Sequence, residues 1–139
     1  MKIYLSEFAI SPDITRNNNY DEVIELILKV CKQKGIGLFR SRDFWGYDSI
    51  ENCIRHSNLL IALIDEYWTS STWKLHELFY AAGTTDDMGT IKLPAEKIAT
   101  IAYLFDDIKT PWLKSLHNTL VIQNNLEVLR EYLIGPAKC

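Results

Sequence analysis

The sequence predicts a single-domain α/β protein with a flavodoxin-like three-layer fold, in which a five-stranded parallel sheet carries helices on both faces. Strand and helix patterns alternate about five times along the 139 residues, as in chains of parallel βαβ units. Leu59–Ile64 is a run of six apolar residues, which indicates a central strand buried on both faces. The length and the 47% hydrophobic content suit one domain over residues 1–139.

The first strand is expected over Lys2–Phe8. A helix over Tyr20–Lys34 follows, with its apolar residues at helical spacing. Asn19 is its expected N-cap, because Glu22 follows three residues later in the manner of a capping box. Gly35 stands where a helix commonly ends.

The next elements lead to the central strand. Ile36–Phe39 is a short predicted strand, and Arg40–Tyr47 is a predicted loop rich in charged and aromatic residues. A helix with an apolar stripe then ends near His56.

After the central strand the alternation continues to the C-terminus. Asp65–Ser71 is a predicted turn before a helix over Trp73–Ala82, which Gly83 ends. The remaining expectations are a polar loop over 84–97, a strand over Ile98–Leu104, an irregular stretch over Asp106–Asn118 with one short helix near Pro111, a strand over Thr119–Gln123, and a closing helix over Leu126–Leu133.

Composition and cysteine spacing narrow the expected class of partner and the expected cellular compartment. The net charge of −3 has no basic excess of the kind that nucleic-acid binding needs, and no apolar run reaches the roughly 18 residues of a membrane span. The three cysteines (Cys31, Cys53 and Cys139) are widely spaced and form no CxxC pair, so we expect neither disulfides nor a metal site and place the protein in the cytoplasm.

Several common site motifs are missing from the sequence. It contains no GxGxxG after the first strand, no GxxxxGK[ST] and no GxSxG. A standard dinucleotide fold site, a P-loop and an α/β-hydrolase elbow are therefore not expected. In a parallel sheet ligands bind beyond the carboxyl ends of the strands, where the loops after Phe8, Phe39 and Ile64 meet.

Two stretches near those loops carry a recognisable pattern. The first is Arg42-Asp43-Phe44-Trp45-Gly46, and the second runs from Tyr67 through Ser70, Ser71 and Trp73 to Glu77-Leu78. Their order and spacing over about Lys2–Gly83 resemble the Toll/interleukin-1 receptor-like (TIR) family, and the short length is similar to that of bacterial stand-alone TIR-like proteins. Trp73 and Glu77 match the Trp-x-x-x-Glu pattern of enzymatic members, whereas Lys74 stands where many members carry cysteine.

The resemblance implies cleavage of NAD at its nicotinamide–ribose bond, with NAD as substrate and no cofactor. The transition state of such a reaction is similar to an oxocarbenium ion, which one carboxylate beside the ribose can stabilise. Glu77 is the expected catalytic residue, and Trp73 shares its helix face one turn earlier. The expected substrate-binding residues are Ser6, Phe8, Arg40, Arg42, Asp43, Phe44, Ser71 and Trp73, with Phe8 stacking on nicotinamide and Arg40 or Arg42 pairing with the pyrophosphate.

Ordinary structural roles remain open for the same residues. Trp73 is equally suited to the core, Glu77 to complementing the helix dipole, and Arg42 with Asp43 to a local ion pair. Phe44 and Trp45 suit a self-association surface as well as a substrate contact.

Three functions follow from these alternatives. The first is an NAD glycohydrolase that produces a linear or cyclic ADP-ribose signal for a separate effector protein, as in anti-phage defence. The second is a non-enzymatic TIR module that assembles with other TIR surfaces. The third is an enzyme similar to nucleoside deoxyribosyltransferases, in which a KIYL opening and a helix-borne carboxylate also occur.

Overall fold

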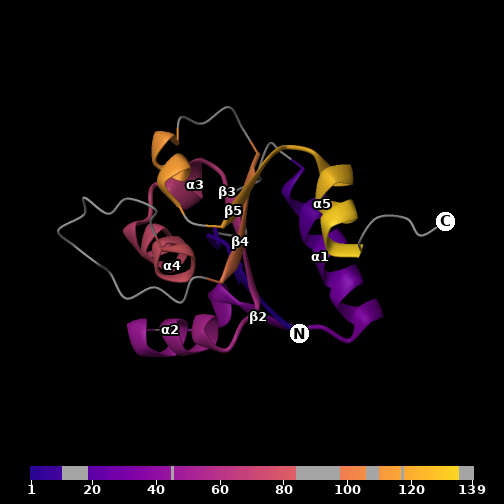
Figure 1. Cartoon of the computed structure of the whole chain (residues 1–139), viewed down its shortest axis with the longest axis horizontal. Coiled ribbons are helices and arrows are strands. Elements are labelled where there is room, and N and C mark those ends of the chain that lie inside the picture. The colour runs from indigo at the N-terminus through magenta and orange to yellow at the C-terminus, as the bar shows by residue number, and fades with distance from the viewer. Residues whose placement is uncertain (11–18, 45, 84–97, 106–109, 117, 135–139) are drawn as a thin grey trace.

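The computed structural model describes residues 1–10, 19–44, 46–83, 98–105, 110–116 and 118–134. Five parallel strands form one sheet in the order β2-β1-β3-β4-β5. This order is the flavodoxin-like one, in which the chain runs outward in opposite directions from β1 and β3. The expected fold class, with its five-stranded parallel sheet, is confirmed (Figure 1).

Strands and helices alternate along the chain. In order, the elements are β1 Lys2–Ser6, α1 Tyr20–Lys34, β2 Gly37–Arg40, the 3-10 helix η1 Ser41–Asp43, α2 Tyr47–Arg55, β3 Leu59–Ile64, α3 Glu66–Thr69, α4 Thr72–Ala82, β4 Ala99–Leu104, the 3-10 helix η2 Pro111–Ser115, β5 Thr119–Gln123 and α5 Leu126–Ile134. All six residues of β3 are buried, as its unbroken apolar sequence predicts.

The helices divide between the two faces of the sheet. Helices α1 and α5 cover one face, and α2, α3 and α4 cover the other (Figure 1). Each face has its own apolar core, so the helices on both faces that the sequence predicts are present.

Strand β1 contributes to both cores because its side chains alternate. Ile3 and Leu5 point into the core beneath α1 and α5, whereas Tyr4 points into the core beneath α2 and α4. Ser6 follows the alternation of Tyr4, and both side chains reach the same residue of α4. Strand β1 therefore delivers polar groups to the α4 side at its carboxyl end.

The predicted bounds of three strands are wrong by one or two residues, and β4 begins at Ala99 rather than Ile98. Strand β1 ends at Ser6 rather than Phe8, since the backbone N–H of Glu7 donates to Ser41 Oγ instead of to a neighbouring strand. Strand β2 is Gly37–Arg40 rather than Ile36–Phe39, because the register pairs Gly37 with Lys2 and Arg40 with Leu5.

Local structure also departs from two predicted turns and one cap. The segment Asp65–Ser71 contains the short helix α3, which Asp65 caps by accepting from the Trp68 N–H at 2.9 Å. The predicted loop Arg40–Tyr47 contains η1. Asn19 stands at the start of α1, but its side chain makes no capping hydrogen bond, since its backbone (φ −86°, ψ 34°) lies outside the extended region typical of an N-cap.

The expected glycines at the ends of two helices are confirmed. Gly35 ends α1 in the left-handed conformation (φ 65°), and Gly83 ends α4. Cys31 and Cys53 are buried free thiols. No helix in the described part of the chain is long and apolar enough to cross a membrane. The expected loop over 84–97, Trp45 and Cys139 lie outside the described residues.

Candidate functional site

A cavity of about 550 Å³ opens at the carboxyl ends of β1 and β2. Three segments meet there: the residues after β1, the residues after β2, and the first turn of α4. Its lining residues are Glu7, Phe8, Ala9, Ser41, Arg42, Phe44, Gly46, Ile50, Trp73 and Lys74. The cavity lies beside the β1/β3 switch point, where open parallel sheets bind ligands, and its size is typical of small-molecule sites.

Glu77 lies one side chain behind this cavity. Its carboxylate is fully buried and accepts hydrogen bonds from Tyr4 Oη and from Ser6 Oγ, the latter at 3.0 Å. Lys74 Nζ lies 3.1 Å from Oε2 and 3.4 Å from Oε1. The carboxylate is thus held by groups from β1 on one side and from its own helix on the other.

Burial raises the pKa of Glu77 above its ordinary value, because the protein interior disfavours the charged form. The Lys74 ammonium and the hydrogen bonds from Tyr4, Lys74 and Ser6 act in the opposite direction. The net pKa shift is upward. A carboxyl group with a shifted pKa beside a cavity is a common property of functional sites.

The partners of Glu77 are themselves buried and held in place. Burial and the neighbouring Glu77 raise the pKa of Tyr4, so its hydroxyl stays protonated and donates to the carboxylate. Ser6 Oγ donates to Glu77 and accepts from the Trp68 indole N–H at 3.1 Å. Trp68 and Ser6 are both fully buried, which keeps this chain of donors in one arrangement.

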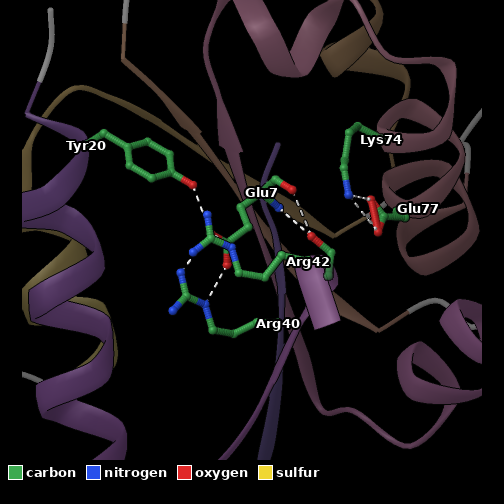
Figure 2. A network of polar contacts seen from close by, with 7 residues as sticks. Glu7, Tyr20, Arg40, Arg42, Lys74 and Glu77 are labelled. Carbon is green, nitrogen blue, oxygen red and sulfur yellow. Dashed lines mark hydrogen bonds and ion pairs between the residues drawn. The ribbon is translucent and has the colours of Figure 1, made fainter. Parts of the chain in front are cut away.

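A second buried carboxylate, Glu7, lies on the other side of β1 (Figure 2). Arg40 donates to both its oxygens, with Nε 2.7 Å from Oε2 and Nη2 2.8 Å from Oε1. Tyr20 of α1 donates to Oε1 at 3.1 Å, and Arg42 Nε lies 3.5 Å from the same atom. Ser41 Oγ bonds to both the backbone N–H and the backbone carbonyl of Glu7, each at 2.9 Å.

The two arginines that the sequence offered for a pyrophosphate differ in this structure. Arg40 is committed to Glu7 through two short hydrogen bonds, and Glu7 raises its pKa further. Arg42 is 39% exposed, makes one longer contact with Glu7, and lines the cavity. Arg42 is therefore the arginine available to a ligand.

The expected site residues fall into three groups. Phe8, Arg42, Phe44 and Trp73 are brought together around the cavity. Ser6 and Glu77 form the buried pair behind it. Arg40, Asp43 and Ser71 are outside the set of described residues that line the cavity: Arg40 binds Glu7, Asp43 is exposed in η1, and Ser71 precedes α4.

The structure also decides among the ordinary roles. Trp73 is 36% exposed and lines the cavity, so it is not a core aromatic. Glu77 is fully buried within α4 and is not an exposed acid complementing the helix dipole. Arg42 contacts Glu7 and, within the described part of the chain, forms no ion pair with Asp43.

Three further residues belong to the site but were not expected there as functional groups: Tyr4, Glu7 and Lys74. Lys74 could have been found from its i,i+3 spacing to Glu77. Tyr4 could have been found because it shares a strand face with Ser6. No local sequence pattern identifies Glu7, since its partners come from α1, β2 and η1.

Metal binding has no support in the described part of the chain, where no group of three or more His, Cys, Asp or Glu side chains is arranged to hold an ion. The cavity instead combines aromatic side chains with the cations Arg42 and Lys74 and the anion Glu7. Such a lining suits a ligand with flat rings and a negatively charged group.

Comparison with known proteins supports the fold. Neither a scan of protein-family profiles nor a search of curated proteins finds a match. Among solved structures, the chain is similar to the crystal structure of a conserved protein from Enterococcus faecalis V583, with a TM-score of 0.57 and 16% sequence identity, covering 96% of each chain. At this identity the similarity concerns the fold alone.

Proposed function

We propose that the protein is a TIR-like enzyme that cleaves NAD to nicotinamide and ADP-ribose. The observation that carries the proposal is Glu77, a buried carboxylate with a raised pKa, one side chain behind a cavity lined by aromatic and cationic residues. Trp73 and Phe8, which the TIR resemblance assigns to the substrate, line that cavity.

The reaction needs little more than these groups. Water adds to C1′ of the ribose as the C1′–N bond breaks; nicotinamide leaves as a neutral molecule and one proton is released. Because the pyridinium nitrogen takes the bonding electrons, the leaving group needs no general acid. The Glu77 carboxylate stabilises the positive charge that develops on the ribose ring and accepts hydrogen bonds from its hydroxyl groups.

The lining residues account for binding. Phe8 and Trp73 offer flat faces to the nicotinamide ring, and Phe44, on the segment after β2, lines the same cavity. Arg42 is exposed enough to pair with the pyrophosphate. In this proposal Arg40 supports Glu7 and Arg42 indirectly instead of contacting substrate.

A second candidate is transfer of a deoxyribosyl group between bases. It rests on the KIYL opening and a helix-borne carboxylate, and the two are in direct contact: Tyr4 of that opening donates to Glu77. Glu77 would then act as the nucleophile at C1′ of a deoxynucleoside. Both candidates use the same carboxylate on an N-glycosidic bond, so substrates distinguish them.

The wider setting belongs to the same proposal. Buried free cysteines favour the reducing cytoplasm. We infer that the enzyme self-associates through TIR-type surfaces, for which the exposed residue Asp43 after β2 is available. Its product, a linear or cyclic ADP-ribose, would signal to a separate effector protein in anti-phage defence.

Incubation with NAD and chromatographic separation of the products test the proposal. We expect the wild type to release nicotinamide at high protein concentration, a condition that also allows any self-assembly needed for activity. Glu77→Gln should lower the rate of release by about 10³-fold. Exposed Glu25→Gln on α1 is the matched control. Base exchange on deoxynucleosides without NAD cleavage would support the second candidate. No turnover of either substrate at any protein concentration would favour a non-enzymatic TIR module.

A further inference from the structure

Lys74 contacts Glu77 (Figure 2) and also lines the cavity. Glu77 has three described side-chain partners, namely Tyr4, Ser6 and Lys74. Among these three, Lys74 alone belongs to the described cavity lining. Lys74 is therefore the partner of Glu77 that a ligand in the cavity can contact.

In this arrangement both carboxylate oxygens are fully used. Oε1 accepts from Tyr4 and lies 3.4 Å from Lys74 Nζ, while Oε2 accepts from Ser6 at 3.0 Å and lies 3.1 Å from Nζ. The Glu77 side chain has no exposed surface, and that of Lys74 is only 12% exposed. A ribose that is to contact the carboxylate has to displace one of these partners, and Lys74 is the one that lines the cavity.

Moving Lys74 off Glu77 is unfavourable unless another anion receives its charge. The ion pair is largely buried, and separating such a pair leaves two charges without compensation. A phosphate in the cavity compensates the lysine charge, because the flexible lysine side chain can exchange a carboxylate for a phosphate, and Glu77 keeps its hydrogen bonds from Tyr4 and Ser6. Arg42 and the amino-terminal turn of the 11-residue helix α4, which contains Lys74, favour negative charge in the same place.

We propose that Lys74 is a positioning residue that caps Glu77 until a phosphate of the ligand draws its ammonium away. The site then accepts phosphate-bearing N-glycosides and leaves Glu77 covered when an uncharged glycoside enters. This inference rests on the proposed function, since it names the substrate class of the same site.

The first test compares turnover of NAD, nicotinamide mononucleotide and nicotinamide riboside, which share the bond to be broken but differ in phosphate content. In the wild type, kcat for the riboside should be at least tenfold below kcat for the two nucleotides. In Lys74→Met, KM for NAD should rise about tenfold, whereas kcat for the riboside should rise. Each kcat is taken on the plateau of its pH profile, because loss of Lys74 also raises the pKa of Glu77.

Matched variants separate capping from charge alone. Lys74→Arg keeps the positive charge and should retain the preference for nucleotides, and Lys32→Met makes the same substitution at an exposed position of α1 on the other face of the sheet. A simple phosphate-binding lysine predicts that Lys74→Met raises KM for NAD and leaves kcat for the riboside unchanged. That result, or equal wild-type kcat for all three substrates, would overturn the proposal.

The second test does not depend on turnover. Nuclear magnetic resonance of the lysine ammonium groups in the wild type should show that ADP-ribose shifts the Lys74 signal, whereas adenosine at saturation does not; Lys74→Met assigns the signal. A Lys74 signal that shifts equally with ADP-ribose and with adenosine would refute the proposal. A selective response without cleavage of NAD would refute the glycohydrolase and keep the capping role. Cleavage of NAD with a Lys74 signal that ADP-ribose does not shift would support the glycohydrolase and refute the capping role.

Discussion

Two glutamates lie fully buried at the carboxyl end of β1, and they differ in how their charge is compensated. Glu7 receives a bidentate arginine, a second arginine and a tyrosine hydroxyl, so two positive charges surround one negative charge. Glu77 receives one lysine and two neutral hydroxyl donors, and burial still raises its pKa. A buried carboxylate whose charge is fully compensated by neighbouring cations suits a structural role. A buried carboxylate whose charge is only partly compensated is suited to stabilise a positive charge in a ligand.

The largest effect is expected from removing the arginine that holds Glu7. Arg40→Met should lower the free energy of unfolding by about 3 kcal/mol, because it leaves the buried Glu7 carboxylate with only the Tyr20 hydroxyl and the longer contact to Arg42. Chemical denaturation of the variant and the wild type at neutral pH measures the change.

Arg42→Met is the matched control for this prediction. It should cost less than about 1 kcal/mol of stability, because Arg42 is 39% exposed. It should also raise KM for NAD about tenfold, as expected for loss of one charge-assisted contact. Equal destabilisation by the two variants would contradict the division of labour between the arginines.

A smaller effect should appear in the pH dependence of stability at Glu77. Its raised pKa means that the neutral form favours folding, so the stability of the wild type relative to Glu77→Gln should be greatest below the ordinary glutamate pKa. That relative stability should fall as pH rises through the raised folded-state pKa. Denaturation curves of both proteins from acidic to neutral pH measure the difference.

The charged and titratable groups around Glu77 make this prediction specific. Lys74 on α4 and Tyr4 on β1 contact it directly, and Cys53 on α2 faces Tyr4. Thermal unfolding of Lys74→Met over the same pH range should show a steeper loss of stability with rising pH. The wild-type Lys74 ammonium opposes the upward shift in the pKa of Glu77, and the variant lacks it. A relative stability of the wild type that is constant or rises with pH would argue against a raised pKa of Glu77.

The smallest effect is expected from one hydroxyl. Ser6→Ala removes a donor to Glu77 and the acceptor of the Trp68 indole N–H, which should cost about 1 kcal/mol and reduce kcat severalfold. Ser57→Ala deletes another buried serine hydroxyl, which donates to the Cys53 carbonyl at 2.7 Å, and should cost similar stability with unchanged kcat. An equal loss of kcat in both variants would mean that Ser6 acts only through stability.

Local pattern was sufficient for the order of the elements. Three predictions that depended only on neighbouring residues are confirmed: the buried strand Leu59–Ile64, the end of α1 at the glycine after Lys34, and the helical spacing in α4. The short helix α3 was missed because its four residues are too few for a periodic pattern. The end of β1 was misplaced because Ser41, distant in sequence, receives the hydrogen bond of the Glu7 N–H.

The candidate site shows the same division between near and distant residues. The resemblance to TIR domains, carried by motif order and spacing, drew attention to Glu77, Trp73, Phe8 and the Arg42 loop. Sequence could not reveal which arginine is tied to Glu7, nor that Tyr4 and Ser6 hold Glu77 across more than 70 positions of chain. Those pairings depend on the sheet register and on which face of β1 each side chain takes, and both are set only when the whole chain packs.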